Sequence, residues 1–339
     1  MKEAAVLFAA PALVTAAILH LWLRRGAAMP LDVANERSLH RGAVPRIGGV
    51  AMTFGWVTGL VALFGGTGIA PPTETWVILA AALGLFLISL VDDCRSLPVV
   101  PRLLGHLAAA GLAVAALDLP APAMLPAILA LVWMTNLYNF MDGADGLAGG
   151  MAAIGFGALA IAAMPTAPGM AAVCLVISGA AVGFLVFNFP PARVFMGDAG
   201  SIPLGFLAGA LGLAGWREDV WSLWFPLLVF SPFIGDATVT LGRRLRRGAR
   251  VWQAHREHAY QSLVLSGWSH RKLTLAAWTL MAAAAAGALA LRGWPDTWLR
   301  GVLTAWTLVL LGIFFSVDRR CRAATGGGRS PGQASRGGP

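Results

Sequence analysis

Long apolar runs of 14 to 20 residues alternate with short polar connections along most of this chain. A helix needs about 20 mainly apolar residues to cross the hydrocarbon core of a bilayer. The pattern therefore predicts an all-α, polytopic membrane protein with eleven spanning helices, or ten as the alternative. The expected spans are residues 4–23, 47–65, 75–91, 103–118, 123–138, 147–163, 170–187, 202–215, 223–241, 273–291 and 298–316.

The first apolar run is predicted to be an anchored helix and not a cleaved signal peptide. It is long for a signal peptide, it lacks a small-residue cleavage site, and Arg24 and Arg25 follow it directly. Residues 1–318 are expected to form one integral-membrane domain with polar loops on one side. Residues 319–339 are basic, end in a Gly-rich stretch without apolar content, and are expected to be a disordered tail.

Composition agrees with a membrane protein. The 339 residues are 58% hydrophobic and only 12% charged, with a mean hydropathy of +0.72, whereas a soluble domain carries about 25% charged residues. The three cysteines lie far apart and indicate neither a zinc site nor a disulfide framework. A net charge of +9 raises the question of nucleic-acid binding, but loop topology explains it without such a partner.

The distribution of Lys and Arg predicts the orientation. With an outside (periplasmic) N-terminus, the inner segments would be 24–46, 92–102, 139–146, 188–201, 242–272 and the tail from 317. Those segments hold 21 of the 25 basic residues. Because positively charged loops stay in the cytoplasm, this orientation is strongly favoured. It predicts a membrane protein whose polar site faces the cytoplasm.

Six aspartates fall at or near the predicted inner face: Asp92, Asp93, Asp142, Asp145, Asp198 and Asp236. Carboxylates at a membrane edge are costly to desolvate, so they indicate function more often than packing. Asp92 and Asp93 are adjacent like charges, and both stay ionised most easily beside a cation, either an arginine or a metal. Asp236 is the least certain of the six, because a helix-end charge facing the basic loop also explains it.

The stretch from Asn139 to Gly146 has the most specific spacing. Asn139, Asp142 and Asp145 recur at every third position and are interrupted by glycines. Such oxygen ligands suit Mg²⁺, which takes few protein ligands and completes its shell with water and substrate phosphates. A calcium loop of the EF-hand type is the rival interpretation, but the downstream glutamate of that motif is missing.

Three further segments carry groups suited to an anionic substrate. Arg41 and Arg46 lie in a Gly/Pro-constrained loop, and guanidinium groups bind phosphate oxygens in pairs; a positive-inside loop explains them equally well. Asp198 lies in a Gly-Asp-Ala-Gly-Ser sequence that is either part of a phosphate site or only a helix cap. His255 and His258 flank Arg256, and a zinc pair is disfavoured because no third N or S ligand is near.

Together, Asp92-Asp93, Asn139–Gly146, Phe195–Ser201 and His255–Gln261 resemble the polyprenyl-phosphate N-acetylhexosamine-1-phosphate transferase superfamily. That superfamily includes the initiators of O-antigen synthesis and the phospho-MurNAc-pentapeptide translocase of peptidoglycan synthesis. The His-Arg-Glu-His-Ala-Tyr-Gln sequence is more similar to the O-antigen branch than to the peptidoglycan enzyme, which typically has three consecutive histidines.

The resemblance implies transfer of a sugar 1-phosphate from a UDP-N-acetylhexosamine to undecaprenyl phosphate, with release of UMP. It implies Mg²⁺ as the cofactor, with Mn²⁺ as a substitute, and it is compatible with a homodimer. Asp198 would ligate the metal, with Asn139 as a second candidate. Catalytic roles fall to Asp92 and Asp93 on the lipid-phosphate side and to Asp142 and Asp145 on the nucleotide side. Substrate contacts fall to Arg41, Arg46, Asn188, Phe195, His255, Arg256 and His258.

Two alternatives stay open at this stage. A proton-coupled transporter or flippase would place its acids at mid-membrane depth, whereas these acids gather near one face. Within the transferases, an aspartyl-phosphate intermediate and direct attack by the lipid phosphate both fit the sequence. Direct attack is favoured because a lipid phosphate is already an adequate nucleophile.

Overall fold

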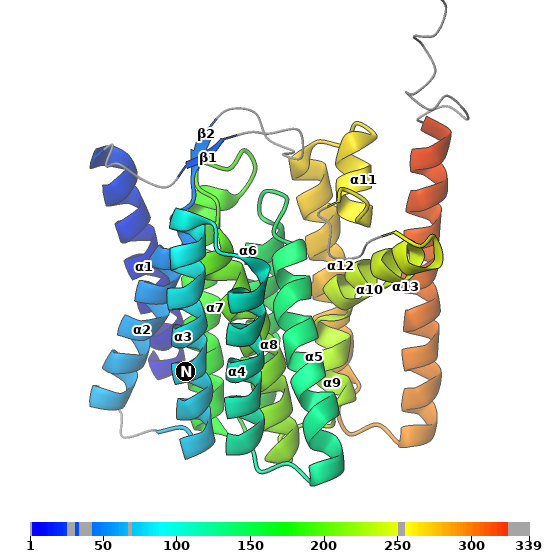
Figure 1. Ribbon diagram of the computed structural model, residues 1–339. Helices are drawn as coiled ribbons and strands as arrows, with labels where there is room; N and C mark the ends of the chain where they lie inside the picture. The colour runs from blue at the N-terminus through cyan, green and yellow to red at the C-terminus, as the bar shows by residue number, and fades with distance from the viewer. Residues whose placement is uncertain (1, 26–30, 34–42, 67–69, 250–254, 325–339) are drawn as a thin grey trace, which may run out of the picture.

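The computed structural model describes residues 2–25, 31–33, 43–66, 70–249 and 255–324, and these form a bundle of helices (Figure 1). A two-stranded antiparallel sheet of β1 (Leu31–Val33) and β2 (Ala43–Pro45) lies at one end. The helices are α1 (Lys2–Arg25), α2 (Gly48–Gly66), α3 (Thr73–Arg95), α4 (Val99–Ala116), α5 (Ala121–Phe140), α6 (Leu147–Ala163), α7 (Pro168–Asn188), α8 (Asp198–Arg217), α9 (Trp224–Val229), α10 (Ser231–Arg246), α11 (Ala259–Leu265), α12 (His270–Ala290) and α13 (Asp296–Ala324).

The predicted all-α membrane architecture is confirmed. Among the described residues, nine helices are long and apolar enough to cross a membrane, and the apolar α6 is shorter at 17 residues. These ten helices match ten of the eleven expected spans to within a few residues. The last helix, α13, continues through Ala324, so the first residues of the expected tail are helical; residues 325–339 lie outside the described part of the chain.

The expected span 223–241 is not one helix. It is divided into the short α9 and the longer α10, which leaves the bundle at a steep angle to its neighbours (Figure 1). Pro232 causes the division, because it has no N–H to donate to the carbonyl of Leu228 four residues earlier. The Ser231 hydroxyl donates to that carbonyl instead, at 2.7 Å.

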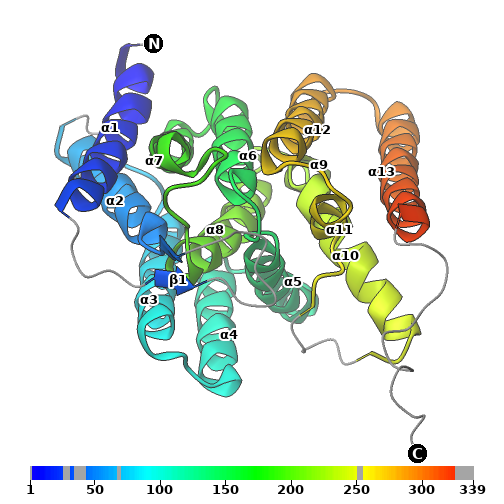
Figure 2. The same cartoon turned by 90° about the horizontal axis from the view of Figure 1, so that it is seen from above.

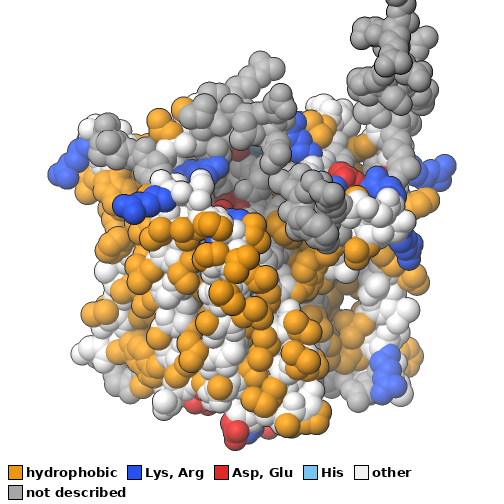
Figure 3. Space-filling model, viewed as in Figure 1, with side chains coloured by type: hydrophobic (Ala, Val, Ile, Leu, Met, Phe, Trp, Pro, Cys, Tyr) orange, Lys and Arg blue, Asp and Glu red, His pale blue; other side chains and the backbone are white. Residues whose placement is uncertain are grey.

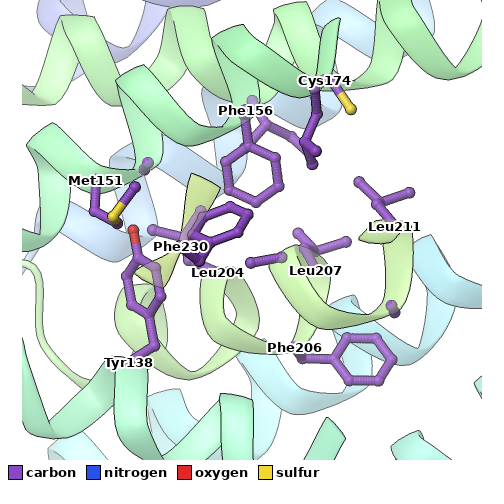
Figure 4. Packing of buried hydrophobic residues seen from close by; sticks show 14 of the residues in the cluster. Tyr138, Met151, Phe156, Cys174, Leu204, Phe206, Leu207, Leu211 and Phe230 are labelled. Atoms are coloured by element: carbon purple, nitrogen blue, oxygen red, sulfur yellow. The ribbon is translucent and has the colours of Figure 1, made fainter. Parts of the chain in front are cut away.

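The centre of the bundle is formed by α6, α7 and α8, and most of their side chains are buried. Seen from above, these helices lie between α1 and α2 on one side and α12 and α13 on the other (Figure 2). Phe156, Phe206 and Phe230 are fully or almost fully buried, and Tyr138 contacts the same core (Figure 4). A rigid core of this kind fixes the helix ends, and the polar residues lie at those ends.

Basic side chains gather at one end of the molecule, above a broad apolar belt (Figure 3). The outer helices α1 and α13 expose large apolar side chains such as Leu13 and Phe315, as expected for surfaces that face lipid. The end that carries β1, β2 and α11 is also the end at which α3, α5, α7 and α10 finish and α8 and α12 begin (Figure 1). All the site residues discussed below lie at this end.

Candidate active site

The pair Asp92 and Asp93 lies in the last turn of α3, and the two carboxylates have different partners. Asp92 is buried and accepts a hydrogen bond from the Arg102 guanidinium at 2.8 Å and one from the N–H of Leu97. Arg102 lies in the first turn of α4 and is also 3.8 Å from the Asp198 carboxylate. Arg102 is therefore the cation beside Asp92, and the sequence motifs did not include it.

Asp93 holds the start of α8. Its two carboxylate oxygens accept the N–H groups of Asp198 and Ala199, at 3.2 and 2.9 Å. The preceding Gly197 has φ +74°, and an added Cβ would lie 2.9 Å from an Asp93 oxygen. Glycine is therefore required here by the backbone conformation and by the close carboxylate. Asp93 thus fixes the position of Asp198, the first residue of α8.

Asp198, the first residue of α8, lies where the ends of α3, α4 and α5 meet. Its side chain is about 30% exposed and lies near Arg102. The Asn139 side chain, in the last turn of α5, hydrogen-bonds to it, and Asp92 and Arg46 are close enough to interact electrostatically. The two predicted metal ligands, Asp198 and Asn139, are therefore neighbours, although they are 59 positions apart in the sequence.

Arg46 and Phe195 are joined through their backbones. The segment from Pro45 to Gly49 runs beside Phe195 and Met196, with hydrogen bonds between Phe195 N and Pro45 O, Gly48 N and Phe195 O, and Gly49 N and Met196 O, all 2.8–2.9 Å. This pairing brings the Arg46 guanidinium close enough to Asp93 and Asp198 to interact electrostatically with both carboxylates. The other predicted arginine of this loop, Arg41, lies outside the described residues.

Asp145 and Asn188 connect two loops. Asp145 is buried, and its carboxylate accepts the N–H of Ala192 at 3.0 Å and lies 3.1 Å from His270 Nδ1. Asn188 is also buried; it accepts the N–H of Gly146 and donates to the carbonyl of Val194, both at 2.8 Å. The structure thus places both predicted residues where they hold the 139–146 loop against the 188–198 loop.

Asp142 lies on the other side of the same loop, next to Tyr260 of α11. Burial, and then Asp236 and Asp142, raise the pKa of the Tyr260 hydroxyl, so the phenol stays protonated. It donates to the carbonyl of Phe140 at 2.9 Å. A Cβ at Gly143 would lie 2.2 Å from this hydroxyl, so only glycine allows the approach. The 139–146 loop is therefore in contact with the His255–Gln261 segment.

Asp236, the least certain aspartate from the sequence, anchors α11. It is buried on α10, and its carboxylate oxygens accept the N–H groups of Ala259 and Tyr260, at 2.8 and 3.2 Å. His258 Nδ1 lies 3.5 Å from the same carboxylate. Asp236 is thus more than a helix-end charge: it positions the segment that contains the two predicted histidines.

His255 and His258 are stacked with their ring centroids 4.9 Å apart. Burial, then His258 and Arg244, lower the pKa of His255 to about 4. His255 is therefore neutral at pH 7 when no anion is bound. Glu257 forms ion pairs with Arg244 of α10 and with Arg247, the residue that follows α10, which ties this segment to α10 a second time. Arg256, which lies between His255 and Glu257 in the sequence, is half-buried.

Most predicted site residues are therefore brought together around the 139–146 loop. Asp92, Asp93, Asn139, Asp198 and Arg46 form one cluster; Asp145 and Asn188 are buried in hydrogen bonds; and Asp142 joins the histidine segment. Sequence reasoning missed Arg102 and His270. Arg102 falls among the expected loop charges, and His270 falls in the expected inner loop 242–272, where no motif includes it. Among the described residues, no group of three or more His, Cys, Asp or Glu side chains is arranged to hold a metal ion.

Comparisons with known proteins indicate the family of this chain. Residues 75–216 match the model of glycosyl transferase family 4. The chain is 30% identical over 263 residues to a probable undecaprenyl-phosphate N-acetylglucosaminyl 1-phosphate transferase of Bacillus subtilis, with 72% of each chain covered. It is 29% identical to the decaprenyl-phosphate N-acetylglucosaminephosphotransferase of Mycobacterium tuberculosis, over 71% of this chain and 70% of that one.

A phospho-N-acetylmuramoyl-pentapeptide-transferase of Lacticaseibacillus paracasei is 35% identical, but over 152 residues that cover 44% of this chain and 46% of the relative. The matched family region contains Asp92, Asp93, the 139–146 loop and Asp198, which are the residues that the fold assembles at one end of the bundle. The resemblance noted from the motifs is therefore confirmed. The chain is a multi-pass membrane protein that belongs to glycosyl transferase family 4.

Proposed function

We propose that this protein transfers N-acetylhexosamine 1-phosphate from a UDP-sugar to undecaprenyl phosphate, which starts the synthesis of an O-antigen or another cell-surface polysaccharide. The observation that carries the proposal is the cluster of Asp92, Asp93, Arg102, Asn139 and Asp198 at one end of an apolar bundle. A site at the membrane edge suits a reaction between a lipid phosphate and a water-soluble nucleotide sugar.

In this reaction, an oxygen of the lipid phosphate forms a bond to the β-phosphorus of the UDP-sugar. The bond from that phosphorus to the bridging oxygen breaks, and UMP leaves with the oxygen. A phosphate monoester has a second pKa near 6 and is largely dianionic at pH 7, so the attack needs no strong base. Asp92 and Asp93 both accept hydrogen bonds from the protein, which supports direct attack and positioning roles for both.

The main task of the protein is then to bring two anions together. Arg102 and Arg46 supply positive charge beside Asp198, and guanidinium groups bind phosphate oxygens in a fixed geometry. His255, His258 and Arg256 lie on the far side of the 139–146 loop, where they would contact the diphosphate or the sugar. Asp142 would line the nucleotide side from within the loop, and Asp145, which is buried with both carboxylate oxygens bound by the protein, would hold the loop in place.

The residues present fit Mg²⁺ as the cofactor. Mg²⁺ is commonly bound by one or two carboxylates, and water and substrate phosphates complete its coordination shell. Asp198 is partly exposed and Asn139 is its neighbour, and these two would hold the ion. When bound, Mg²⁺ would neutralise charge on the diphosphate; Mn²⁺ would substitute.

The orientation follows from charge. The site end of the bundle carries most of the basic side chains visible in Figure 3, and basic loops stay in the cytoplasm. We therefore place the N-terminus in the periplasm and the site at the cytoplasmic face of the bacterial inner membrane, where nucleotide sugars are made. A homodimer stays an expectation from the family, and a mass measurement in nanodiscs would test it.

The transfer of phospho-MurNAc-pentapeptide is the second candidate within the same family. Relatives with that activity in their name match less than half of this chain, whereas the N-acetylglucosamine enzymes match about 70%. The His-Arg-Glu-His sequence at 255–258 also differs from the peptidoglycan pattern. Both observations favour an N-acetylhexosamine donor.

One assay tests the proposal. Purified full-length protein in lipid nanodiscs is incubated with undecaprenyl phosphate, Mg²⁺ and a panel of UDP-N-acetylhexosamines and UDP-MurNAc-pentapeptide, and UMP release is measured. We expect at least one UDP-N-acetylhexosamine to give lipid-dependent UMP release, and UDP-MurNAc-pentapeptide to give none. Activity with the pentapeptide alone would establish the second candidate, and no release with any donor would refute the proposal.

A further inference from the structure

Three polar side chains of α12 lie on one face of that helix and contact the backbone or side chains of the 139–146 loop. His270, Thr274 and Trp278 are four residues apart, so they lie one above the other along the helix. α12 lies outside the region that matches the family model, which ends at residue 216. We call His270, Thr274 and Trp278 the α12 stripe.

Each member of the α12 stripe makes a specific contact at the end of the loop. His270 Nδ1 is 3.1 Å from Asp145 Oδ1, the Thr274 hydroxyl donates to the carbonyl of Asp145 at 2.6 Å, and the Trp278 indole N–H donates to the carbonyl of Gly146 at 2.9 Å. Thr274 is fully buried. Backbone carbonyls in such a position need a partner, because an unpaired buried acceptor is costly.

The other polar groups at the end of the 139–146 loop form hydrogen bonds with the last residue of α7 and with the loop that follows it. Asn188 accepts the N–H of Gly146, and the other Asp145 oxygen accepts the N–H of Ala192. The end of the 139–146 loop is therefore fixed from two directions, by the α12 stripe on one side and by the 188–192 region on the other. The start of the loop is fixed separately, because it continues directly from α5.

We infer that the α12 stripe positions the 139–146 loop for binding of the UDP-sugar, and that His270 is a positioning residue of the transferase. The inference rests on the proposed function, in which the loop that carries Asp142 and Asp145 lines the nucleotide side. His270 touches Asp145 and not the reacting phosphates, so its loss affects the reaction through the loop. The lipid-phosphate side, with Asp92 and Arg102, is built by α3 and α4 and does not depend on α12.

Because the α12 stripe supports the nucleotide side only, its substitution should change KM for the UDP-sugar and not KM for undecaprenyl phosphate. In H270A and T274V, the loop loses one fixed contact, and KM for the UDP-sugar rises roughly tenfold, the scale expected for one buried hydrogen bond. KM for undecaprenyl phosphate stays within twofold of the wild type. H270N places an amide group, which can both donate and accept, near the position of Nδ1, so it recovers most of the loss. T274S, which keeps the hydroxyl, does the same.

T279V is the matched control. Thr279 lies on the same helix, is exposed, and donates only to the carbonyl of Leu275 within α12, at 2.9 Å. The chemical change is the same as in T274V, but no loop contact is lost. We expect T279V to have the kinetic constants of the wild type.

Hydrogen–deuterium exchange gives a readout that does not depend on the reaction. The amides of residues 141–147 exchange faster in H270A and T274V than in the wild type and T279V, while amides in α3 and α4 are unchanged. Unchanged exchange in the loop, or equal rises in both KM values, would overturn the inference. If the wild type transfers no sugar phosphate, the proposed function is refuted. Faster loop exchange in H270A and T274V would in that case still support the role of the α12 stripe in holding the loop.

Discussion

At the scale of single residues, Arg102 connects two carboxylates that come from different helices. It donates to Asp92 at 2.8 Å and lies 3.8 Å from Asp198. Without this cation, Asp92 and Asp198 would repel each other and any incoming phosphate. Arg102 is therefore expected to matter both for the shape of the site and for the approach of the lipid phosphate.

We predict that R102M lowers kcat about 100-fold or more, the scale for loss of one positioned donor in an active site. R102K keeps a charge but not the paired donors, so it should retain intermediate activity. R292M is the control, because Arg292 lies at the opposite end and donates to the carbonyl of Val220. Initial rates of UMP release measure all three, and wild-type rates for R102M would contradict the role.

The low pKa of His255 leads to a proton-linked prediction. Burial and neighbouring cationic groups lower this pKa to about 4, so His255 is neutral at pH 7 in the free protein. A bound diphosphate favours the charged form and raises the pKa. Binding of UDP should therefore take up protons, and the uptake should grow as the pH falls from 7 towards 5.

Calorimetry in two buffers with different ionisation enthalpies measures this uptake. We expect H255Q to bind UDP with less proton uptake than the wild type at pH 5.5. E74Q serves as the control, because Glu74 lies in the first turn of α3, at the other end of that helix from Asp92. Equal uptake in the wild type and H255Q would show that His255 does not sense the diphosphate.

At the scale of elements, the apolar runs were sufficient to predict ten of the helices, because about 20 apolar residues in a row have few alternatives to a membrane span. The division between α9 and α10 could not be predicted. Proline is tolerated in membrane helices, and the partner that the Leu228 carbonyl finds in the Ser231 hydroxyl is visible only in three dimensions.

Some features of the site could also be predicted from the sequence, and others could not. Asp92, Asn139 and Asp198 stand out as polar groups beside apolar runs, and the fold brings them together. The contacts of Asp236 could not be inferred, because its partners Ala259 and Tyr260 donate through their backbones and therefore leave no trace in the side-chain pattern. The same holds for the backbone carbonyls that the α12 stripe contacts.

The contacts of Asp236 predict that its substitution displaces α11. In D236A, the N–H groups of Ala259 and Tyr260 lose their acceptor, so α11 and His258 are no longer held in place. We expect kcat to fall at least tenfold, with a loss of stability of about 1–3 kcal/mol for the unpaired buried groups. Activity and thermal unfolding in detergent measure the two effects, with D118N as the control, because Asp118 is exposed at the end of α4. Wild-type activity in D236A would contradict the anchoring role.

At the scale of the whole molecule, the proposed orientation places Cys94 on the cytoplasmic side. Cys94 is exposed beside Asp93, whereas Cys174 is buried and Cys321 is partly buried. A C174A/C321S variant therefore has a single native thiol at the site end of the bundle. We expect a membrane-impermeant maleimide to label it in inside-out vesicles but not in intact spheroplasts.

A cysteine placed at the exposed Asp118, at the other end of the bundle, gives the matched control in a chain that lacks the three native cysteines. It should show the opposite pattern, with labelling in spheroplasts. Labelling of Cys94 from outside the cell would mean that the orientation is inverted, and the site could not then receive a cytoplasmic nucleotide sugar.

In the proposed reaction, Asp198 and its neighbours transfer a sugar phosphate to a lipid phosphate. The most direct test follows the β-phosphorus of a UDP-N-acetylhexosamine, labelled with ³²P, in nanodiscs that contain undecaprenyl phosphate and Mg²⁺. We predict that the label moves to the organic-extractable lipid with the wild type, that the transfer requires both the lipid phosphate and Mg²⁺, and that D198N, folded normally, transfers none. Full transfer by D198N, or label that reaches only water or the protein, would contradict this prediction.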